Sequence, residues 1–132
     1  MNNLNWVHVS NVQDELLSMI YSEARVLIMP SIAEGFGLPV VEAISCGCPI
    51  LLSSVGPFHE IVSHLEIDYA SRDACIRWTD PIDPLELMNG IRYFTTMNES
   101  QRVDCGHALS NSSAFYSGWN DLTKSIWSAI NE

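Results

Sequence analysis

The sequence predicts an α/β fold in which helices flank a parallel sheet. Short runs rich in Val, Ile and Leu alternate with segments whose apolar residues recur at helical spacing, which is typical of βαβ units. Proline and glycine stand at the boundaries between these segments. The chain has 132 residues, a length that fits one domain with its own core. We therefore expect a single unit over residues 1–132, without internal repeats.

The first half of the chain predicts three strands separated by two helices. Asn11, with Asp14 three residues later, is an N-cap signal for the first helix. Pro39 suits the first position of the second helix, because its backbone angle is fixed and it lacks an N–H, and Gly47 ends that helix. The expected elements are a strand at 7–9, a helix whose apolar face carries Leu16, Leu17, Ile20, Tyr21 and Ala24, a buried strand at 25–29, a helix at 39–46 and a strand at 49–53 covered on both faces.

The second half predicts mainly helices. Asp83-Pro84-Leu85-Glu86 resembles a capping box with proline at the first helical position. The helix that follows keeps Gly90 at a cost of about 1 kcal/mol. The expected elements are a short helix at 58–65, a short strand or extended segment at 74–78, a helix with Leu87, Met88, Ile91 and Phe94 inward, a weaker helix at 101–109, a loop at 110–113 and a terminal helix with Trp119, Leu122, Ile126, Ala129 and Ile130 on one face.

Composition excludes several classes of function. The net charge is −10, and the six Lys and Arg residues form no patch, so we expect no nucleic-acid binding. No apolar run approaches the roughly 20 residues that span a bilayer, and no signal peptide is visible, so we expect a cytoplasmic protein. The four cysteines are then expected to be free, buried thiols rather than zinc ligands.

The loop and helix from Glu34 to Glu42 form the candidate site. Gly35 and Gly37 would let a ligand approach the backbone, and the free amides at the start of the next helix attract anions. Glu34 and Glu42 bracket these amides. A ligand that carries both phosphates and hydroxyl groups would use every one of these features.

Each feature also has a purely structural explanation. Glu42 alone would complement the helix dipole, which is worth roughly 0.3–1 kcal/mol. Glu34 could be a solvated loop acid, with the two glycines serving only the turn. His8, His59 and His64 are expected at the surface or with satisfied hydrogen bonds, and no metal site is expected.

Residues 30–43, Pro-Ser-Ile-Ala-Glu-Gly-Phe-Gly-Leu-Pro-Val-Val-Glu-Ala, resemble the Glu-x7-Glu motif of retaining GT-B glycosyltransferases, the group 1 glycosyl transferases. The similarity extends along nearly the whole chain. The flanking matches are Asp14-Glu15-Leu16 before Tyr21 and Ala24, Gly47 with Pro49, Ser53-Ser54 and Gly56 with Glu60, Asp80-Pro81, and Phe115 with Trp119.

This resemblance implies a fold and a set of roles. The chain would be a Rossmann-like, partial doubly wound parallel sheet, the C-terminal, donor-binding half of a GT-B fold. Glu34 would be the catalytic residue that accepts hydrogen bonds from the donor sugar, and Glu42 would bind the ribose hydroxyls. The remaining donor-binding residues implied are Gly35, Phe36, Gly37, Leu38 and Val41. No cofactor and no metal are implied, because the nucleotide-diphosphate sugar is itself the donor substrate.

The chain also departs from the family. Such enzymes carry an N-terminal acceptor domain, and an Arg and a Lys reach the diphosphate from segments that have no counterpart before Asn5. We therefore expect an incomplete domain, inactive alone, whose open sheet edge favours a homo-oligomer or a partner chain. Two alternatives to a retained part of an enzyme are a nucleotide-binding module without catalysis and a self-associating fragment.

Overall fold

The computed structural model describes residues 6–112 and confirms the α/β class. Its three parallel strands are ordered β1-β2-β3 and pair in register, with Ile28 opposite Leu51 and Leu51 opposite Arg77. The strands are β1 (Leu27–Met29), β2 (Ile50–Ser53) and β3 (Ile76–Thr79). The helices are α1 (Asp14–Glu23), α2 (Leu38–Ser45), α3 (Gly56–Ser63), α4 (Tyr69–Cys75), α5 (Pro84–Thr95) and α6 (Glu99–Ser112).

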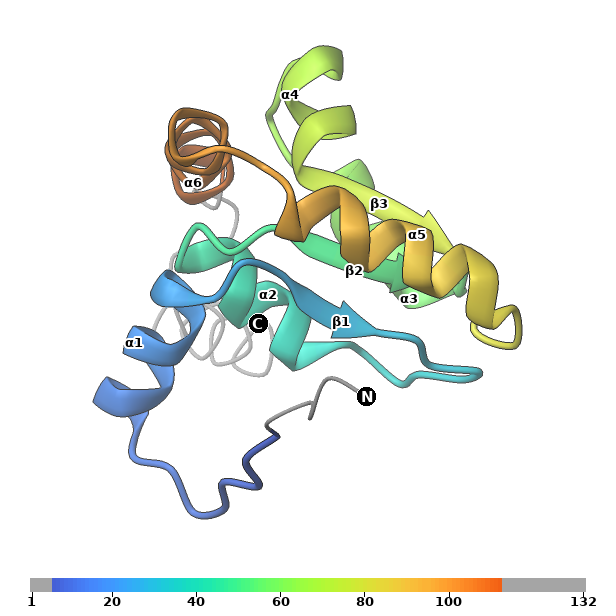
Figure 1. Ribbon diagram of the computed structural model, residues 1–132, viewed down its shortest axis with the longest axis horizontal. Coiled ribbons are helices and arrows are strands. Elements are labelled where there is room, and N and C mark those ends of the chain that lie inside the picture. The colour runs from blue at the N-terminus through green and yellow to red at the C-terminus, as the bar shows by residue number, and fades with distance from the viewer. Residues whose placement is uncertain (1–5, 113–132) are drawn as a thin grey trace, which may run out of the picture.

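Helices cover both faces of the sheet. α5 crosses one face, whereas α2 and α3 lie on the other (Figure 1). β2 is central, and all four of its residues are buried, as the sequence predicts for a strand covered on both faces. β1 lies at the edge and is only half-buried, which corrects the expectation of a buried strand there. The carboxyl ends of all three strands meet at one edge of the sheet.

Gly90 brings α5 close to the sheet. A Cβ atom at Gly90 would lie 2.6 Å from Cδ1 of Leu51, which is fully buried in β2. The glycine that weakens the helix by propensity is therefore required by packing. Phe94 is buried on this helix as predicted, but Met88 is 49% exposed, which corrects its inward assignment.

Two other expectations are wrong, at residues 7–9 and at residues 110–112. Residues 7–9 form no strand and are exposed, and among the described residues no strand lies beyond β1 with which they could pair. The first helix is present as predicted, and of its apolar face Tyr21 and Ala24 pack against the core. Residues 110–112 continue α6 instead of forming a loop, and the buried Leu109 and Ser112 hold this end of the helix.

α4 is a helix that the sequence analysis missed. Its sequence is polar and has no apolar stripe, but Asp68 caps it by accepting a hydrogen bond from the Ser71 amide at 3.0 Å. The predicted terminal helix lies outside the described residues. In the part of the chain that is described, no helix is long and apolar enough to cross a membrane.

Candidate functional site

The loop that follows β1 delivers the predicted site residues to the carboxyl edge of the sheet. α2 begins at Leu38, and Pro39 occupies its first turn, one residue from the predicted start. Gly37 precedes the helix with a φ of 88°, in the left-handed region that favours glycine. A Cβ atom there would lie 2.8 Å from Cε1 of the buried Phe58. Backbone geometry and packing therefore both require Gly37.

The amino end of α2 carries no side-chain cap. The residue before the helix is Gly37, which has no side chain, and Pro39 cannot donate a hydrogen bond. α5 differs, because the Asp83 carboxylate accepts hydrogen bonds from the amides of Leu85 and Glu86 at 2.8 and 3.3 Å. The first turn of α2 thus has no acidic cap, and because Val40 donates its amide to the carbonyl of Gly37 at 2.9 Å, Leu38 offers the amide available to an anion there.

Gly35 and Glu34 form the outer part of the loop. Oε1 of the half-buried Glu34 accepts a hydrogen bond from the Gly35 amide at 3.0 Å. No atom lies within 4 Å of the position that a Cβ would occupy on Gly35, and its φ is not in the left-handed region. Neither packing nor backbone geometry in the described structure explains this glycine. The space beside it is open to a ligand.

Glu42 lies one turn into α2 and is exposed. Its Oε2 accepts a hydrogen bond from the hydroxyl of Tyr21 on α1 at 3.1 Å. Burial, together with the hydrogen bond and charge of Glu42, raises the pKa of Tyr21 to about 12. The sequence predicts Tyr21 on the apolar face of a helix, and the hydroxyl on that face is the one feature of the sequence that indicates a polar contact there.

The remaining predicted residues line the surface around this helix end. Phe36 is 50% exposed, Leu38 is exposed, and Val41 is half-buried. The structure brings the seven predicted residues onto one continuous loop and helix start.

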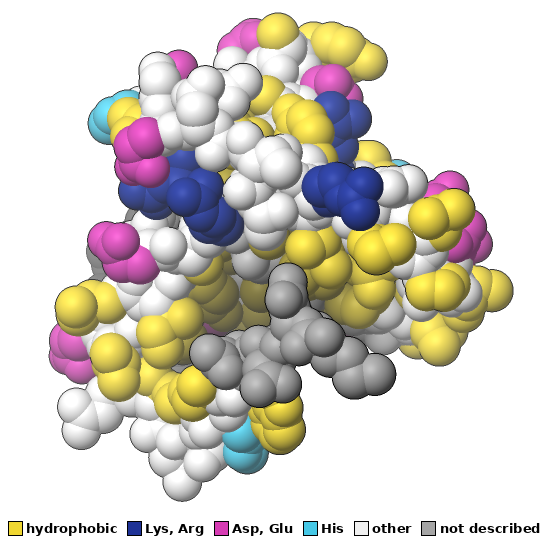
Figure 2. Space-filling view, viewed as in Figure 1, with side chains coloured by type: hydrophobic (Ala, Val, Ile, Leu, Met, Phe, Trp, Pro, Cys, Tyr) yellow, Lys and Arg dark blue, Asp and Glu magenta, His cyan; other side chains and the backbone are white. Residues whose placement is uncertain are grey.

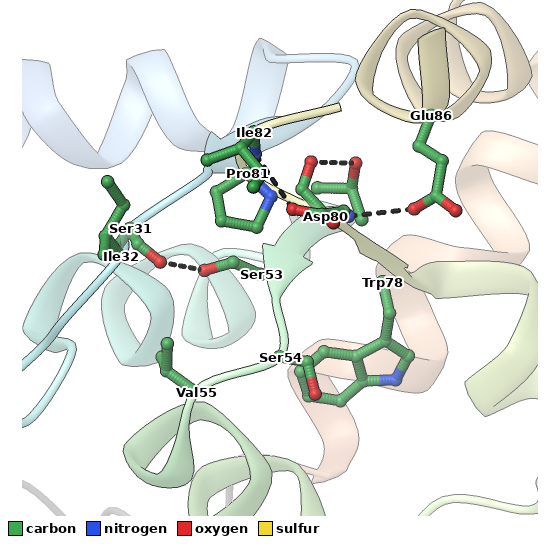
Figure 3. Close-up of a pocket in the computed structure, with 11 residues that line it drawn as sticks. Ser31, Ile32, Ser53, Ser54, Val55, Trp78, Asp80, Pro81, Ile82 and Glu86 are labelled. Carbon is green, nitrogen blue, oxygen red and sulfur yellow. Dashed lines mark hydrogen bonds between the residues drawn. The ribbon is translucent and has the colours of Figure 1, made fainter. Parts of the chain in front are cut away.

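A separate hollow of about 580 Å³ lies over the carboxyl ends of the strands (Figure 3). Residues 34–42 do not line it, although Ser31 and Ile32 of the same loop do. Its charged lining residues are Asp80 and Glu86, and no Lys or Arg takes part. The hollow is lined by Ser31, Ile32, Ser53, Ser54, Val55, Trp78, Thr79, Asp80, Pro81, Ile82 and Glu86. The helix that borders it, α5, is capped by Asp83 and carries Glu86 in its first turn, so the hollow offers a diphosphate no uncapped helix end.

Hydrogen bonds and ring stacking hold the walls of this hollow. The Ser53 hydroxyl donates to the carbonyl of Ser31 and ties the loop to β2. His59 stacks on Trp78 with ring centroids 4.2 Å apart. Oε2 of Glu86 accepts a hydrogen bond from the Asp80 amide at 2.9 Å, instead of closing the capping box expected at Asp83.

The arginines lie away from the candidate site. On the face shown in Figure 2, basic side chains gather over α6 and α5, and the edge at the right shows acidic and hydrophobic ones. Arg25 precedes β1, at the end of the strand away from the candidate loop, and donates to the carbonyl of Met97. Arg102 pairs with Glu99 at 2.8 Å. Within the described part of the chain, the end of α2 therefore depends on backbone amides to attract an anion.

Cysteine and histidine side chains provide no metal site among residues 6–112, where no group of three potential ligands is placed to hold an ion. The four cysteines are free, and Cys46 is only half-buried while the others are buried. Burial raises the pKa of the Cys48 thiol to about 11, which keeps it protonated and inert.

Comparison with known proteins identifies the family. Residues 2–106 match the sequence profile of the Glycosyl transferases group 1 family. The chain belongs to this family. The resemblance noted in the sequence is thus confirmed at the level of the family.

Several relatives are named as mannosyltransferases. The chain is 45% identical over 58 residues to O-antigen chain mannosyltransferase B of Escherichia coli, covering 43% of this chain and 15% of that protein. It is 36% identical over 70 residues to O-antigen chain mannosyltransferase RfbU of Salmonella typhimurium, covering 53% of this chain and 20% of that protein. It is 38% identical over 82 residues to MMP alpha-(1->4)-mannosyltransferase of Mycolicibacterium hassiacum, covering 61% of this chain and 18% of that protein. The matches thus span about a fifth or less of these relatives.

The fold matches part of a solved GT-B structure. The chain superposes on sucrose-phosphate synthase from Thermosynechococcus elongatus with a TM-score of 0.75, at 24% identity, over 93% of this chain and 29% of that one. The agreement supports the GT-B assignment of the fold.

Proposed function

We propose that the chain is the nucleotide-sugar-binding part of a retaining glycosyltransferase, which transfers a hexose from a nucleotide-diphosphate sugar. The observation that carries this proposal is the uncapped amino end of α2, which follows a glycine-bearing loop and stands between Glu34 and Glu42. A negatively charged diphosphate is stabilised by such a helix end.

Each residue of the loop has a role in this proposal. The backbone at Gly35 and Leu38 approaches the diphosphate, and the open space beside Gly35 supports this placement. Glu34 accepts hydrogen bonds from the hydroxyls of the sugar. Glu42 accepts them from the ribose diol, because an ionised carboxylate only accepts and a vicinal diol offers two donors. Phe36, Gly37 and Val41 shape the surface around the ligand.

The names of the relatives favour a mannose-bearing donor. Three of the proteins with similar sequences are called mannosyltransferases. We include in the proposal that the transferred hexose is mannose.

Binding by this chain alone is expected to be weak, and transfer absent. Cations usually stabilise a leaving diphosphate, and Arg25 and Arg102 are engaged elsewhere. The transfer reaction is therefore assigned to a larger enzyme or complex to which these residues contribute the donor site.

Calorimetric titration with GDP-, UDP- and ADP-hexoses tests this proposal on the 132-residue chain. We expect one nucleotide to bind, with Glu34→Ala and Glu42→Ala each weakening it. Glu66→Ala is a matched control, since it removes an exposed acid at the same cost in charge. No heat with any donor, or unchanged affinity in both site variants, would show that the site is misassigned.

The edge of the sheet supports a proposal about assembly. Within residues 6–112, β1 pairs with β2 alone, and Leu16, Met19 and Ile20 of α1 are exposed. An unpaired edge with apolar surface nearby favours pairing with a second copy or with another chain. Light scattering at rising concentration should show association, and a monomer throughout would contradict self-association.

A further inference from the structure

Tyr21 connects α1 to the proposed donor site. Its ring is half-buried and packs against the core, so the fold itself fixes where the hydroxyl lies. The hydroxyl donates to Oε2 of Glu42 across 3.1 Å, from a residue 21 positions earlier in the chain. The bond therefore joins two elements that only the tertiary structure brings together.

The hydrogen bond from Tyr21 restricts the side chain of Glu42 before a ligand binds. Its side chain is exposed on α2, where a free carboxylate samples several rotamers and loses that freedom when a ligand binds. A hydrogen bond from the fixed ring of Tyr21 already orders this carboxylate in the free protein, so less conformational entropy is lost when the ligand binds. No other described residue hydrogen-bonds to this carboxylate, so Oε1 keeps its accepting capacity for a ligand.

The hydroxyl stays a donor at ordinary pH. Burial is the largest cause that raises the pKa of Tyr21 to about 12, followed by the hydrogen bond and the charge of Glu42, with smaller effects of Cys46 and Cys48. The proton thus remains on the phenol, and the interaction is a charge-assisted hydrogen bond to a carboxylate.

We infer that Tyr21 is a positioning residue of the donor site, which holds Glu42 so that its free oxygen accepts from the 2′,3′-diol of a ribose. This inference rests on the proposed function. It gives the site a preference for ribonucleotides over 2′-deoxyribonucleotides, and part of that preference depends on the Tyr21 hydroxyl.

Titration with a ribonucleoside diphosphate and its 2′-deoxy form measures this preference. The base is the one that binds best among GDP, UDP and ADP. Tyr21→Phe, which keeps the ring, should weaken ribonucleotide binding about three- to tenfold and the deoxy form less. In a Glu42→Ala background the same substitution should have no further effect.

Tyr93→Phe is the matched control. Tyr93 is also half-buried, and its hydroxyl donates to the carbonyl of Ala74 at 3.4 Å, on a different element. The control should bind both nucleotides as the unchanged protein does. Equal ribonucleotide affinity of Tyr21→Phe and the unchanged protein would overturn the inference and leave the proposed function standing. Absence of nucleotide binding to the unchanged protein would overturn both.

A second measurement needs no ligand. The pKa of Tyr21, followed by NMR of its ring as the pH rises, should fall in Glu42→Gln from about 12, while staying above its ordinary value because burial remains. An unchanged pKa would show that the hydroxyl does not engage Glu42, and this result alone would overturn the inference.

Discussion

The amino ends of α2 and α5 differ in whether a side chain caps them. Both helices carry proline in the first turn, and both follow a strand of the same sheet. Asp83 caps α5 with its own carboxylate, whereas Gly37 leaves the end of α2 without a cap. A capped end stabilises its own helix, and an uncapped end is available to an external anion. Proline alone therefore does not distinguish a binding site from a structural helix start, but the preceding residue does.

The two ends also differ in what surrounds them. Asp80 and Glu86 stand beside the start of α5, and Glu86 accepts from the Asp80 amide. Glu86 lies in the first turn of α5, so its charge would repel a phosphate at that helix end even if the cap were removed. At α2 no acid lies in the first turn, and Glu34 and Glu42 stand before and after it along the chain. This arrangement suits a ligand with an anionic centre and hydroxyl groups on both sides.

The largest expected effect is that of Gly37→Ala. The left-handed backbone and the contact with buried Phe58 each penalise a methyl group, and together they should lower the free energy of unfolding by about 2–4 kcal/mol. Urea denaturation measures this loss.

Gly35→Ala is the control, because no atom lies within 4 Å of the position that its Cβ would occupy. It should change stability by less than about 1 kcal/mol while weakening nucleotide binding. Equal stability losses in the two variants would contradict the distinction between the glycines.

A smaller effect is expected when the cap of α5 is removed. Asp83→Ala leaves the Leu85 and Glu86 amides without their acceptor and should cost about 1 kcal/mol of stability. Asp83→Asn keeps an acceptor and should cost less. The Ala variant should gain no nucleotide affinity, since Asp80 and Glu86 remain. A gain in titration would show that any uncapped helix end of this sheet binds the ligand.

The smallest effect concerns Asp68, which caps α4. Hydrogen bonds from the Ser71 hydroxyl and then from the Ser71 amide lower the pKa of this carboxyl below its usual value. The stability that it contributes is therefore complete above its unfolded pKa of about 3.9 and is lost as the pH falls through the lower folded value. Urea unfolding at a series of pH values should show this loss below about pH 4, and Asp68→Asn should reduce it. An identical pH profile in the variant would contradict the assigned cap.

Periodicity and punctuation in the sequence predicted the elements that position the site. The predicted bounds of β2 and α2 agree with the structure within a residue or two. A run of aliphatic residues indicates β2, and Pro39 and Gly47 mark the two ends of α2. α4 was missed because a cap and packing, rather than an apolar stripe, hold it. Residues 7–9 were assigned as a strand because alternation in three residues says nothing about whether a pairing partner exists.

The site residues were predicted from a motif, and their roles remain predictions. The requirement for Gly37 and the freedom of Gly35 became distinct only in three dimensions, because packing against Phe58 decides between them. The contact between Tyr21 and Glu42 joins two helices, and local sequence patterns do not register such a pairing. The hollow beside Asp80 and Glu86 likewise arises from several strand ends together.

We propose above that the uncapped end of α2 binds the diphosphate of a nucleotide sugar. Backbone amide NMR during titration with the nucleoside diphosphate that binds best tests it directly. We expect chemical-shift changes at the amides of Gly35, Gly37 and Leu38 and none at the amides of Leu85 and Glu86. Changes at the start of α5 or around the hollow, with none at the start of α2, would contradict this proposal.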